Sequence, residues 1–375
     1  MILYLVVLPT ILLHLAFAGC RVNLSLFALN LQATPFTVGA IVSLMALVPT
    51  TFVVGAGRAM DRIGVRKPML LGACATIAGL VLAFAVPRIE MLFIASPLVG
   101  SGFMLYHLAV NHVVGTMGAP EDRVRNFSLL ALAFSTANFI GPMLTGFSID
   151  WIGHRLTFLL LAASALAALI ALYLRPLEVA RRQPPDAPGK KRRMADFWSD
   201  RTMRRVFIVS TALSMSWDLF TFVVPIYGSQ IGLSASEIGL ILGAFGSAIF
   251  VVRLALPLFV HRVSEWRLLL VAMIGTGAGF IVFPLVTTVP VLIAFAFLLG
   301  VGLGGTQPMI MSLLYAHAPP GRGGEAVGVR SLLLSFSQAG IPLLFGALGA
   351  ALGIAPAFWT MAAALAGAGW LLRKR

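Results

Sequence analysis

The sequence predicts an all-α polytopic membrane protein with twelve transmembrane helices, arranged as two parallel six-helix repeats. Of its 375 residues, 59% are hydrophobic and 11% are charged, whereas a soluble domain carries about 25% charged residues. Apolar runs long enough to cross a bilayer, about 20 residues each, recur along the whole chain. The second half also repeats the pattern of the first. These three observations exclude an ordinary soluble enzyme and a disordered chain.

Charged residues, prolines and glycines divide the chain into twelve candidate spans. Their expected ranges are 3–29, 37–57, 69–87, 91–115, 127–149, 156–174, 206–229, 237–259, 267–286, 290–315, 330–350 and 355–372. This division leaves no room for a soluble domain. The apolar start lacks the basic segment that opens a signal peptide, so residues 3–29 are interpreted as the first span.

A shift of 200 residues aligns the two halves without a gap over five spans. Matching residues include Gly39 and Gly239, Gly100 and Gly300, Pro142 and Pro342, and Gly153 and Gly353. Because each half has an even number of spans, both copies share one orientation, and a substrate site is expected between them near the midplane. The expected organisation is an N-terminal bundle, a basic linker and a C-terminal bundle, at residues 1–175, 176–205 and 206–375.

Lys and Arg number 27 against 13 Asp and Glu, which gives a formal charge of +14. In a soluble protein this excess would indicate nucleic acid as a partner. Here the cations cluster after even-numbered spans, while the opposite loops hold only Arg88 and Arg155. The positive-inside rule therefore predicts cytoplasmic termini in a bacterial inner membrane. We expect a lipid bilayer around the chain, no nucleic acid partner, and a monomer.

Motifs of several other protein classes are missing from the sequence. Cys20 and Cys74 lie in apolar runs and indicate no disulfide framework. No metal-binding or nucleotide-binding motif is present, so no metal, no cofactor and no enzymatic activity are expected. Residues 100–102, Gly-Ser-Gly, depart from the G-x-S-G of intramembrane serine proteases, and His107 shares the helix of that serine. These small residues are interpreted as helix packing.

The loop after the second span reads Gly-Arg-Ala-Met-Asp-Arg-Ile-Gly-Val-Arg-Lys at residues 57–67. It resembles the signature loop of the major facilitator superfamily, G-x-x-x-D-R-x-G-x-R-K, at every defining position. Through the twelve spans and the duplication the resemblance covers the whole chain, and it implies a secondary transporter that works by alternating access. The residues that it assigns to a cytoplasmic latch are Gly57, Asp61, Arg62, Gly64, Arg66 and Lys67.

In this latch, Gly57 is expected to let helices approach closely and Gly64 to permit a tight turn. Asp61 is expected to bind backbone amides at the start of the eleventh span, near Arg330 and Ser331, where the helix dipole favours negative charge. The alternative is that the basic residues of the loop only set the topology.

Residues 137–146 of the fifth span read Ala-Asn-Phe-Ile-Gly-Pro-Met-Leu-Thr-Gly. Through Gly141, Pro142 and Gly146 they resemble the antiporter motif of drug/proton exporters, g-x-x-x-G-P-x-x-G-G, and they depart from it at Ala137 and Thr145. The motif favours export. Plain helix packing explains the same residues equally well, and the fourth span lacks the Arg that many proton-coupled exporters carry.

Polar and ionisable groups inside spans are costly and are therefore functional candidates. The candidates for substrate binding or proton coupling are Arg21, Asp218, His107, His14, Asn111, Gln307, Trp217 and Arg253. Asp218 is the only acid well inside a span, and titration of this carboxyl or of His107 would couple transport to protons. The alternative for His107 and Asn111 is a hydrogen bond that holds helices together.

Asp218 corresponds to residue 18 of the first repeat, so its depth differs from that of Arg21 by about 4.5 Å. The two are expected to face each other as a gate that forms in one state and breaks in another, and a static buried pair is the alternative. Arg253 is expected either to bind a substrate anion or to pair elsewhere.

Cations inside the spans outnumber the acid, which suits an anionic substrate better than a cationic drug. The sequence therefore predicts a secondary transporter of a small organic solute, with proton-coupled export preferred over uptake or exchange of an organic anion. A non-transporting receptor or scaffold of the same fold is the remote alternative.

Overall fold

The computed structural model describes residues 2–116, 123–174, 197–198, 200–259, 264–319 and 322–373. The first half consists of α1 (Ile2–Asn30), α2 (Pro35–Ile63), α3 (Arg66–Ala85), α4 (Ile89–Thr116) and α5 (Arg123–Leu174). The second half consists of α7 (Arg201–Gln230), α8 (Ala235–Phe259), α9 (Glu265–Val282), the short 3₁₀-helix η3 (Phe283–Leu285), α10 (Val289–Gly304), α11 (Thr306–His317), α12 (Gly323–Leu352) and α13 (Ala355–Arg373). Most of the predicted linker lies outside the described residues.

The predicted spans coincide with these helices. In the described part of the chain, ten helical stretches are long and apolar enough to cross a membrane. One of them is α5, whose backbone leaves helical geometry at Gly153. This break divides α5 into two segments, which are the fifth and sixth spans. Counting its two segments separately and adding α13, which has 19 residues, gives the predicted twelve. The tenth span is divided into α10 and α11 at Gly305, a break that the apolar pattern did not predict.

The backbone repeats with the same offset as the sequence. Left-handed φ angles occur at Gln32 (63°) and Gly232 (81°), and again at Gly153 (80°) and Gly353 (83°). The members of each pair are 200 residues apart, so the turn after α1 matches the turn after α7, and the break in α5 matches the turn after α12. All four turns lie at one end of the molecule, here called the Gly153 end. The end that carries the α2–α3 turn is called the Gly64 end.

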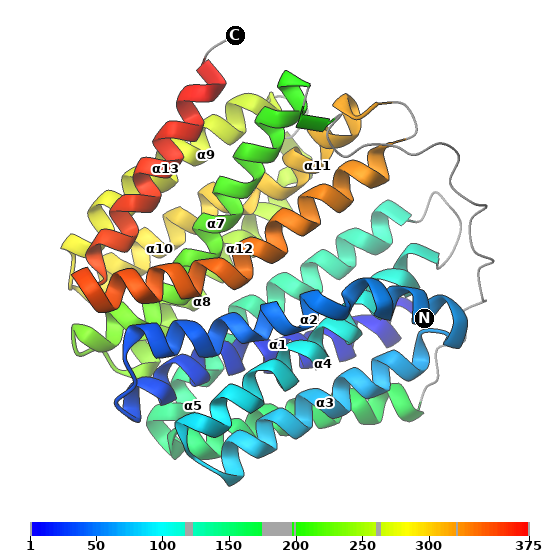
Figure 1. The fold of residues 1–375 in the computed structure, drawn as a ribbon, viewed down its shortest axis with the longest axis vertical. Coiled ribbons are helices and arrows are strands. Elements are labelled where there is room, and N and C mark those ends of the chain that lie inside the picture. Colours follow the sequence, from blue (N-terminus) through cyan, green and yellow to red (C-terminus); the bar gives the residue numbers. More distant parts are fainter. Residues whose placement is uncertain are drawn as a thin grey trace.

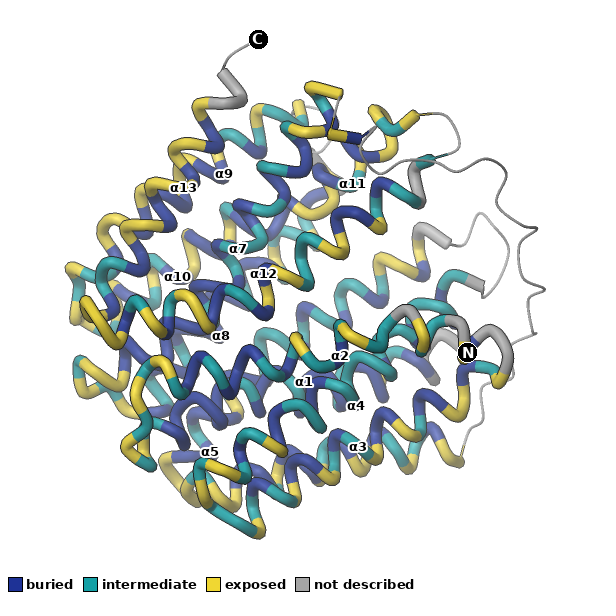
Figure 2. The backbone as a smooth tube through the Cα atoms, in the orientation of Figure 1, coloured by how far each residue is buried: buried dark blue, intermediate teal, exposed yellow. Residues whose placement is uncertain are grey.

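The outward faces of the helices are apolar. Large hydrophobic side chains such as Leu71, Leu258 and Leu298 are exposed on them, and Figure 2 shows exposed positions alternating with buried ones along the outer helices. Exposed apolar side chains on every side are expected where hydrocarbon, rather than water, surrounds a helix bundle. The fold is therefore that of a multi-pass membrane protein.

In the described part of the chain, most contacts between the halves come from two helix pairs, α2 with α12 and α5 with α8, and α1 also contacts α7. At the Gly153 end both pairs pack backbone against backbone. A Cβ added at Gly39 would collide with the carbonyl group of Pro342, and one added at Gly146 would collide with that of Ala235. Towards the Gly64 end the halves diverge, because the end of α2 and the start of α12 lie well apart in Figure 1. The molecule is thus closed at one end and splayed at the other.

Candidate functional site

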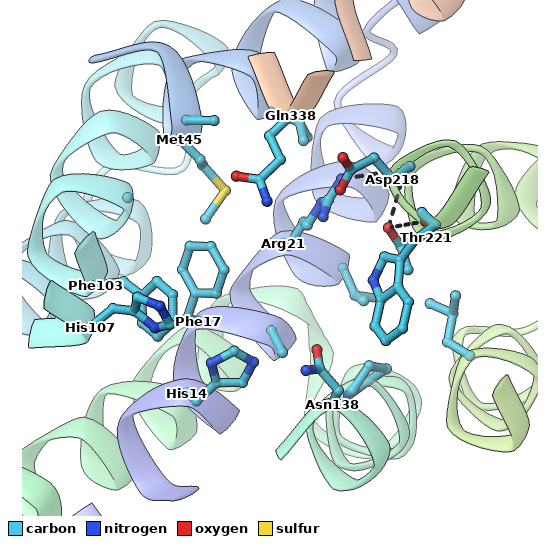
Figure 3. Close-up of a pocket in the computed structure, with 18 of the residues that line it drawn as sticks. His14, Phe17, Arg21, Met45, Phe103, His107, Asn138, Asp218, Thr221 and Gln338 are labelled. Carbon is cyan, nitrogen blue, oxygen red and sulfur yellow. Dashed lines mark hydrogen bonds between the residues drawn. The ribbon is translucent and has the colours of Figure 1, made fainter. Parts of the chain in front are cut away.

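A cavity of about 320 Å³ lies between the two halves. Its lining residues come from α1, α2, α4 and α5 of the first half and from α7, α8 and α12 of the second. Figure 3 shows polar and aromatic side chains from both halves pointing towards one another across this space. Of the sequence-predicted candidates, His14, Arg21, His107, Trp217 and Asp218 line the cavity.

Arg21 and Asp218 are neighbours across the interface, as the repeat offset predicted, but their contact differs from the one expected. Nη2 of Arg21 donates to the backbone carbonyl of Asp218 at 3.5 Å. The Asp218 carboxylate instead accepts a hydrogen bond from Oγ of Ser337 on α12, at 3.1 Å. Nε of Arg21 is buried and has no partner among the described residues. In this conformation the guanidinium therefore retains unused donor capacity.

One wall of the cavity is aromatic. The rings of Phe17 and Phe103 stack with centroids 4.0 Å apart, and His14 lies edge-on to Phe103 at 4.9 Å. His107 lies 4.9 Å from the ring of Phe134. Among the described side chains, both ring nitrogens of His14 and Nδ1 of His107 are buried without a partner in good hydrogen-bond geometry, although the Asn138 amide lies beside His14. Such unsatisfied groups are uncommon in folded proteins, and a polar ligand is one way to satisfy them.

Two amide side chains face the cavity from matching positions of the repeat, Asn138 on α5 and Gln338 on α12. The aromatic residues Phe17 and Phe103 were not predicted as site residues. Helical spacing was the available signal: Phe17 lies three residues after His14 and four before Arg21, and Phe103 lies four before His107, so each shares a helix face with a predicted residue.

Arg253, Gln307 and Asn111 are not lining residues of this cavity. Nη1 of Arg253 donates to Oγ of Ser135 at 2.8 Å and to the Ala131 carbonyl at 3.3 Å. Its Nη2 donates to Oε1 of Gln307 at 3.0 Å. Arg253 therefore connects α8 to α5 and α11 through hydrogen bonds. Of its two expected roles, this is pairing elsewhere rather than binding a substrate anion. The Asn111 amide donates to the carbonyl of His107, on its own helix, at 2.7 Å.

The structure describes part of the predicted latch. Gly64 ends α2 with a φ of 81°, and its N–H donates to the Met60 carbonyl. Arg66 and Lys67 are exposed in the first turn of α3. At Gly57 an added Cβ would make only an ordinary contact, 3.9 Å from Leu108, so no close helix approach depends on this glycine in the present conformation.

The remaining parts of the latch are less fully described. The side chains of Asp61 and Arg62 lie outside the described residues. Their expected partner helix, α12, begins at Gly323 rather than near Arg330. Nε of Arg330 is directed inward and donates to Oγ of Ser210 on α7 at 2.8 Å. The latch therefore stays a prediction from the sequence.

The residues of the antiporter-like motif pack helices together. An added Cβ at Gly141 would lie 3.1 Å from the Leu15 carbonyl on α1. Pro142 and Gly146 lie against Gly239 on α8. Small residues that allow such close approach are typical of membrane helix interfaces. This packing accounts for the motif without deciding the direction of transport.

Two bundles of membrane-length helices around a cavity lined by apolar, aromatic and a few polar side chains are the architecture of a membrane carrier. The sequence profile of the Major Facilitator Superfamily matches residues 6–339, and the chain belongs to this superfamily of transporters, which are not enzymes. No curated protein matches the sequence.

Solved structures share the fold at low sequence identity. A structure of the nucleoside transporter NupG is similar with a TM-score of 0.82 and 12% identity, covering 99% of both chains. The human organic anion transporter MFSD10 gives 0.71 and 16%, covering 99% of this chain and 98% of that one. A peptide transporter POT in complex with sulfate gives 0.78 and 16%, covering 99% and 93%. These likenesses show the fold and leave the cargo of this chain open.

Proposed function

We propose that this chain is a proton-coupled secondary transporter that exports a small organic solute by alternating access through the cavity between its halves. The observation that carries the proposal is the set of unpartnered polar atoms, on Arg21, His14 and His107, inside a cavity that both halves line. Binding a solute there would satisfy groups that are otherwise buried without partners.

The seams between the halves support alternating access. The Gly153 end is closed by backbone contacts at Gly39 and Gly146, while the halves diverge at the Gly64 end. If the positive-inside rule holds, the Gly64 end faces the cytoplasm and this conformation is the inward-facing one. Rocking of one bundle against the other about the cavity would produce the opposite state.

Asp218 is the proposed proton-coupling group. It is buried, lines the cavity, and has Arg21 and Ser337 beside it. Protonation would remove its negative charge next to the guanidinium, and exposure to one side or the other would alternate with the state of the carrier. The export direction rests on the antiporter-like segment around Gly141 and Pro142.

Uptake or exchange of an organic anion is the second candidate. The unpaired Nε of Arg21 favours it, because a buried cation with unused donors is a natural anion site. The two candidates share the cavity and differ in the direction of flux relative to the proton gradient.

The proposal is tested in proteoliposomes with a trapped pH-sensitive dye and an imposed pH gradient. We expect solute flux to move protons in the wild type, and Asp218→Asn to abolish proton movement while solute counterflow remains. Glu90→Gln is the matched control, because Glu90 is an exposed acid in the first turn of α4. Proton movement retained in Asp218→Asn would contradict the coupling role, and absence of counterflow for every solute would favour a receptor or scaffold.

A further inference from the structure

We propose that the cargo of the cavity is a small aromatic carboxylate, with its carboxylate on Arg21 and its ring against Phe17 and Phe103. This inference rests on the proposed transport function and names its substrate class. It joins two features of the cavity, an anion-binding group at one end and an aromatic wall at the other (Figure 3).

The anion-binding end of the cavity is the guanidinium of Arg21, whose donors are mostly unpartnered among the described residues. Its one hydrogen bond among the described residues goes to a backbone carbonyl at a long 3.5 Å, and its Nε has no partner. A guanidinium presents five N–H donors in a planar fork that matches a carboxylate. The nearby carboxylate of Asp218 is directed to Ser337 at 3.1 Å and forms no ion pair with Arg21 within the described residues. The fork is thus open to a carboxylate from the cargo.

The aromatic end offers flat surfaces and unused ring nitrogens. Phe17 and Phe103 form a stacked pair, and His14 and His107 lie beside it. A cargo ring packs against such a wall by offset or edge-to-face contacts. The unpartnered nitrogens of His14 and His107 can then bond a hydroxyl or amino substituent on that ring. A purely aliphatic cargo would make neither the ring contacts with Phe17 and Phe103 nor the hydrogen bonds with His14 and His107.

The spacing of the two ends limits the length of the cargo. His14 and Arg21 are seven residues apart on α1, which separates them by about 10 Å along the helix axis. Phe17 lies between them on the same helix. A single six-membered ring with a carboxylate at one end and one polar substituent at the other fits this distance. The volume of about 320 Å³ lies near the lower limit of ligand pockets, about 300 Å³, which excludes long peptides.

The two charged lining residues, Arg21 and Asp218, balance in sign and differ in their partners: Nε of Arg21 has none among the described residues, whereas the Asp218 carboxylate accepts from Ser337. Among the described lining residues, the titratable or charged groups are Arg21, Asp218, His14 and His107. A cationic amine bound at Asp218 would lie beside the guanidinium of Arg21, which repels it. A zwitterionic aromatic amino acid would need that same carboxylate. We therefore place the carboxylate without an ammonium group as the cargo.

Binding to the full-length purified protein in lipid nanodiscs tests the inference without requiring transport. Trp217 lines the cavity, so its fluorescence reports occupancy, and thermal stabilisation gives a second readout. The probes are 4-hydroxybenzoate, its neutral amide 4-hydroxybenzamide, cyclohexanecarboxylate, tyramine and tyrosine. We expect 4-hydroxybenzoate to bind at least about tenfold more tightly than each of the others, because each lacks at least one of the carboxylate, the aromatic ring and the hydroxyl, or adds an ammonium group.

Variants assign the two ends separately. Arg21→Gln should remove the preference for 4-hydroxybenzoate over its amide, and Arg88→Gln, an exposed cation outside the cavity, should leave it unchanged. Phe17→Leu should weaken 4-hydroxybenzoate more than cyclohexanecarboxylate. Trp217→Phe should remove the change in tryptophan fluorescence on binding of 4-hydroxybenzoate and retain thermal stabilisation by this ligand. If Arg21→Gln is too unstable to purify, Arg21→Lys should still lower the preference, because the planar fork is lost.

The outcomes separate this inference from the proposed function. Equal binding of 4-hydroxybenzoate and cyclohexanecarboxylate, or tighter binding of tyramine or tyrosine, would overturn the aromatic carboxylate. Flux of another solute with no binding of 4-hydroxybenzoate would overturn it and leave the transport function intact. Selective binding of 4-hydroxybenzoate without flux in proteoliposomes would support the cavity assignment and contradict transport.

Discussion

The two seams between the halves are built from equivalent helices, yet they are fastened differently. At the Gly153 end both use glycine and proline packing, with Gly39 against Pro342 in the α2/α12 seam and Gly239 against Pro142 in the α5/α8 seam. The α5/α8 seam adds polar contacts at both ends. Within the described residues, the α2/α12 seam adds one, from Oγ of Ser43 to the Ala339 carbonyl.

The extra contacts of the α5/α8 seam come from two charged residues. The Asp150 carboxylate caps the N-terminus of α8, accepting from the amides of Ala235 at 3.2 Å and Ser236 at 2.8 Å. Towards the Gly64 end, Arg253 bridges α8 to α5. The corresponding positions of the α2/α12 seam hold Ala350 and Val53. A repeated fold can therefore keep its packing and differ in polar contacts, and we expect the α2/α12 seam to open first and furthest at the Gly64 end.

The largest expected effect comes from filling the glycine contacts that both seams share. Gly146→Leu or Gly39→Leu would place a side chain into a backbone carbonyl of the other half. Since overpacking costs about 1–3 kcal/mol and backbone cannot rotate away, we expect a clear fall in unfolding temperature and loss of transport. Gly340→Leu is the control, because nothing lies within 4 Å of an added Cβ there. An equal loss in the control would show that these contacts are not special.

Removing the hydrogen bonds of Arg253 should have the second largest effect on stability. Arg253→Met leaves Gln307 and Ser135 without their cationic partner, and hydrogen bonds to charged groups contribute about 1.5–3 kcal/mol each. We expect the free energy of unfolding to fall by about 2 kcal/mol, measured in detergent by denaturant titration. Val53→Met, at the equivalent position of α2, should have little effect. A double-mutant cycle with Ser135→Ala that gives no coupling energy would contradict the bridge.

The Asp150 cap should have a smaller effect. Asp150→Ala removes the acceptor of two α8 amides, and losing such a cap costs about 1 kcal/mol. The reciprocal change, Ala350→Asp, should give no gain, because α2 begins with Pro35, which has no N–H, and is already capped by Thr34. Differential scanning fluorimetry of both variants checks this asymmetry, and stabilisation by Ala350→Asp would refute it.

The smallest effect is expected from Ser43→Ala in the α2/α12 seam. The hydroxyl bonds a carbonyl inside a helix, so its loss leaves that carbonyl with its helical partner and costs about 0.5 kcal/mol. Unfolding measured beside Arg253→Met provides the comparison. If Ser43→Ala lowered the free energy of unfolding as much as Arg253→Met, the polar contacts of the two seams would contribute equally, which would contradict the comparison.

The fold was largely predictable because it follows from composition and periodicity. The twelve spans and the repeat offset depend on apolar runs and on conserved spacing within one chain, and both are read without knowing any contact. The same offset correctly brought Arg21 next to Asp218. The break between α10 and α11 at Gly305 was not predictable, because a glycine inside an apolar run also occurs within continuous helices.

The site was predictable only in part, because side-chain direction depends on neighbours that the sequence does not reveal. Depth arithmetic could not show that Asp218 bonds Ser337 instead of Arg21, since the choice depends on a hydroxyl from α12. The sequence allows two roles for Arg253. The choice between them depends on its partner on α5, which follows from the packing of α8 against α5. Phe17 and Phe103 form one wall only because α1 and α4 bring their rings into a stack, and this contact is not visible in the sequence.

The open fork of Arg21 also has a kinetic consequence. A buried cation is costly at membrane depth. Among the described residues, Arg21 has only a long hydrogen bond to the Asp218 backbone, and the nearby carboxylate bonds Ser337, so the empty carrier is the form in which this charge is least stabilised. A bound anion would neutralise it during the crossing. We therefore expect the return of the empty carrier to be the slow step of the cycle, and exchange of labelled for unlabelled cargo to run faster than net flux.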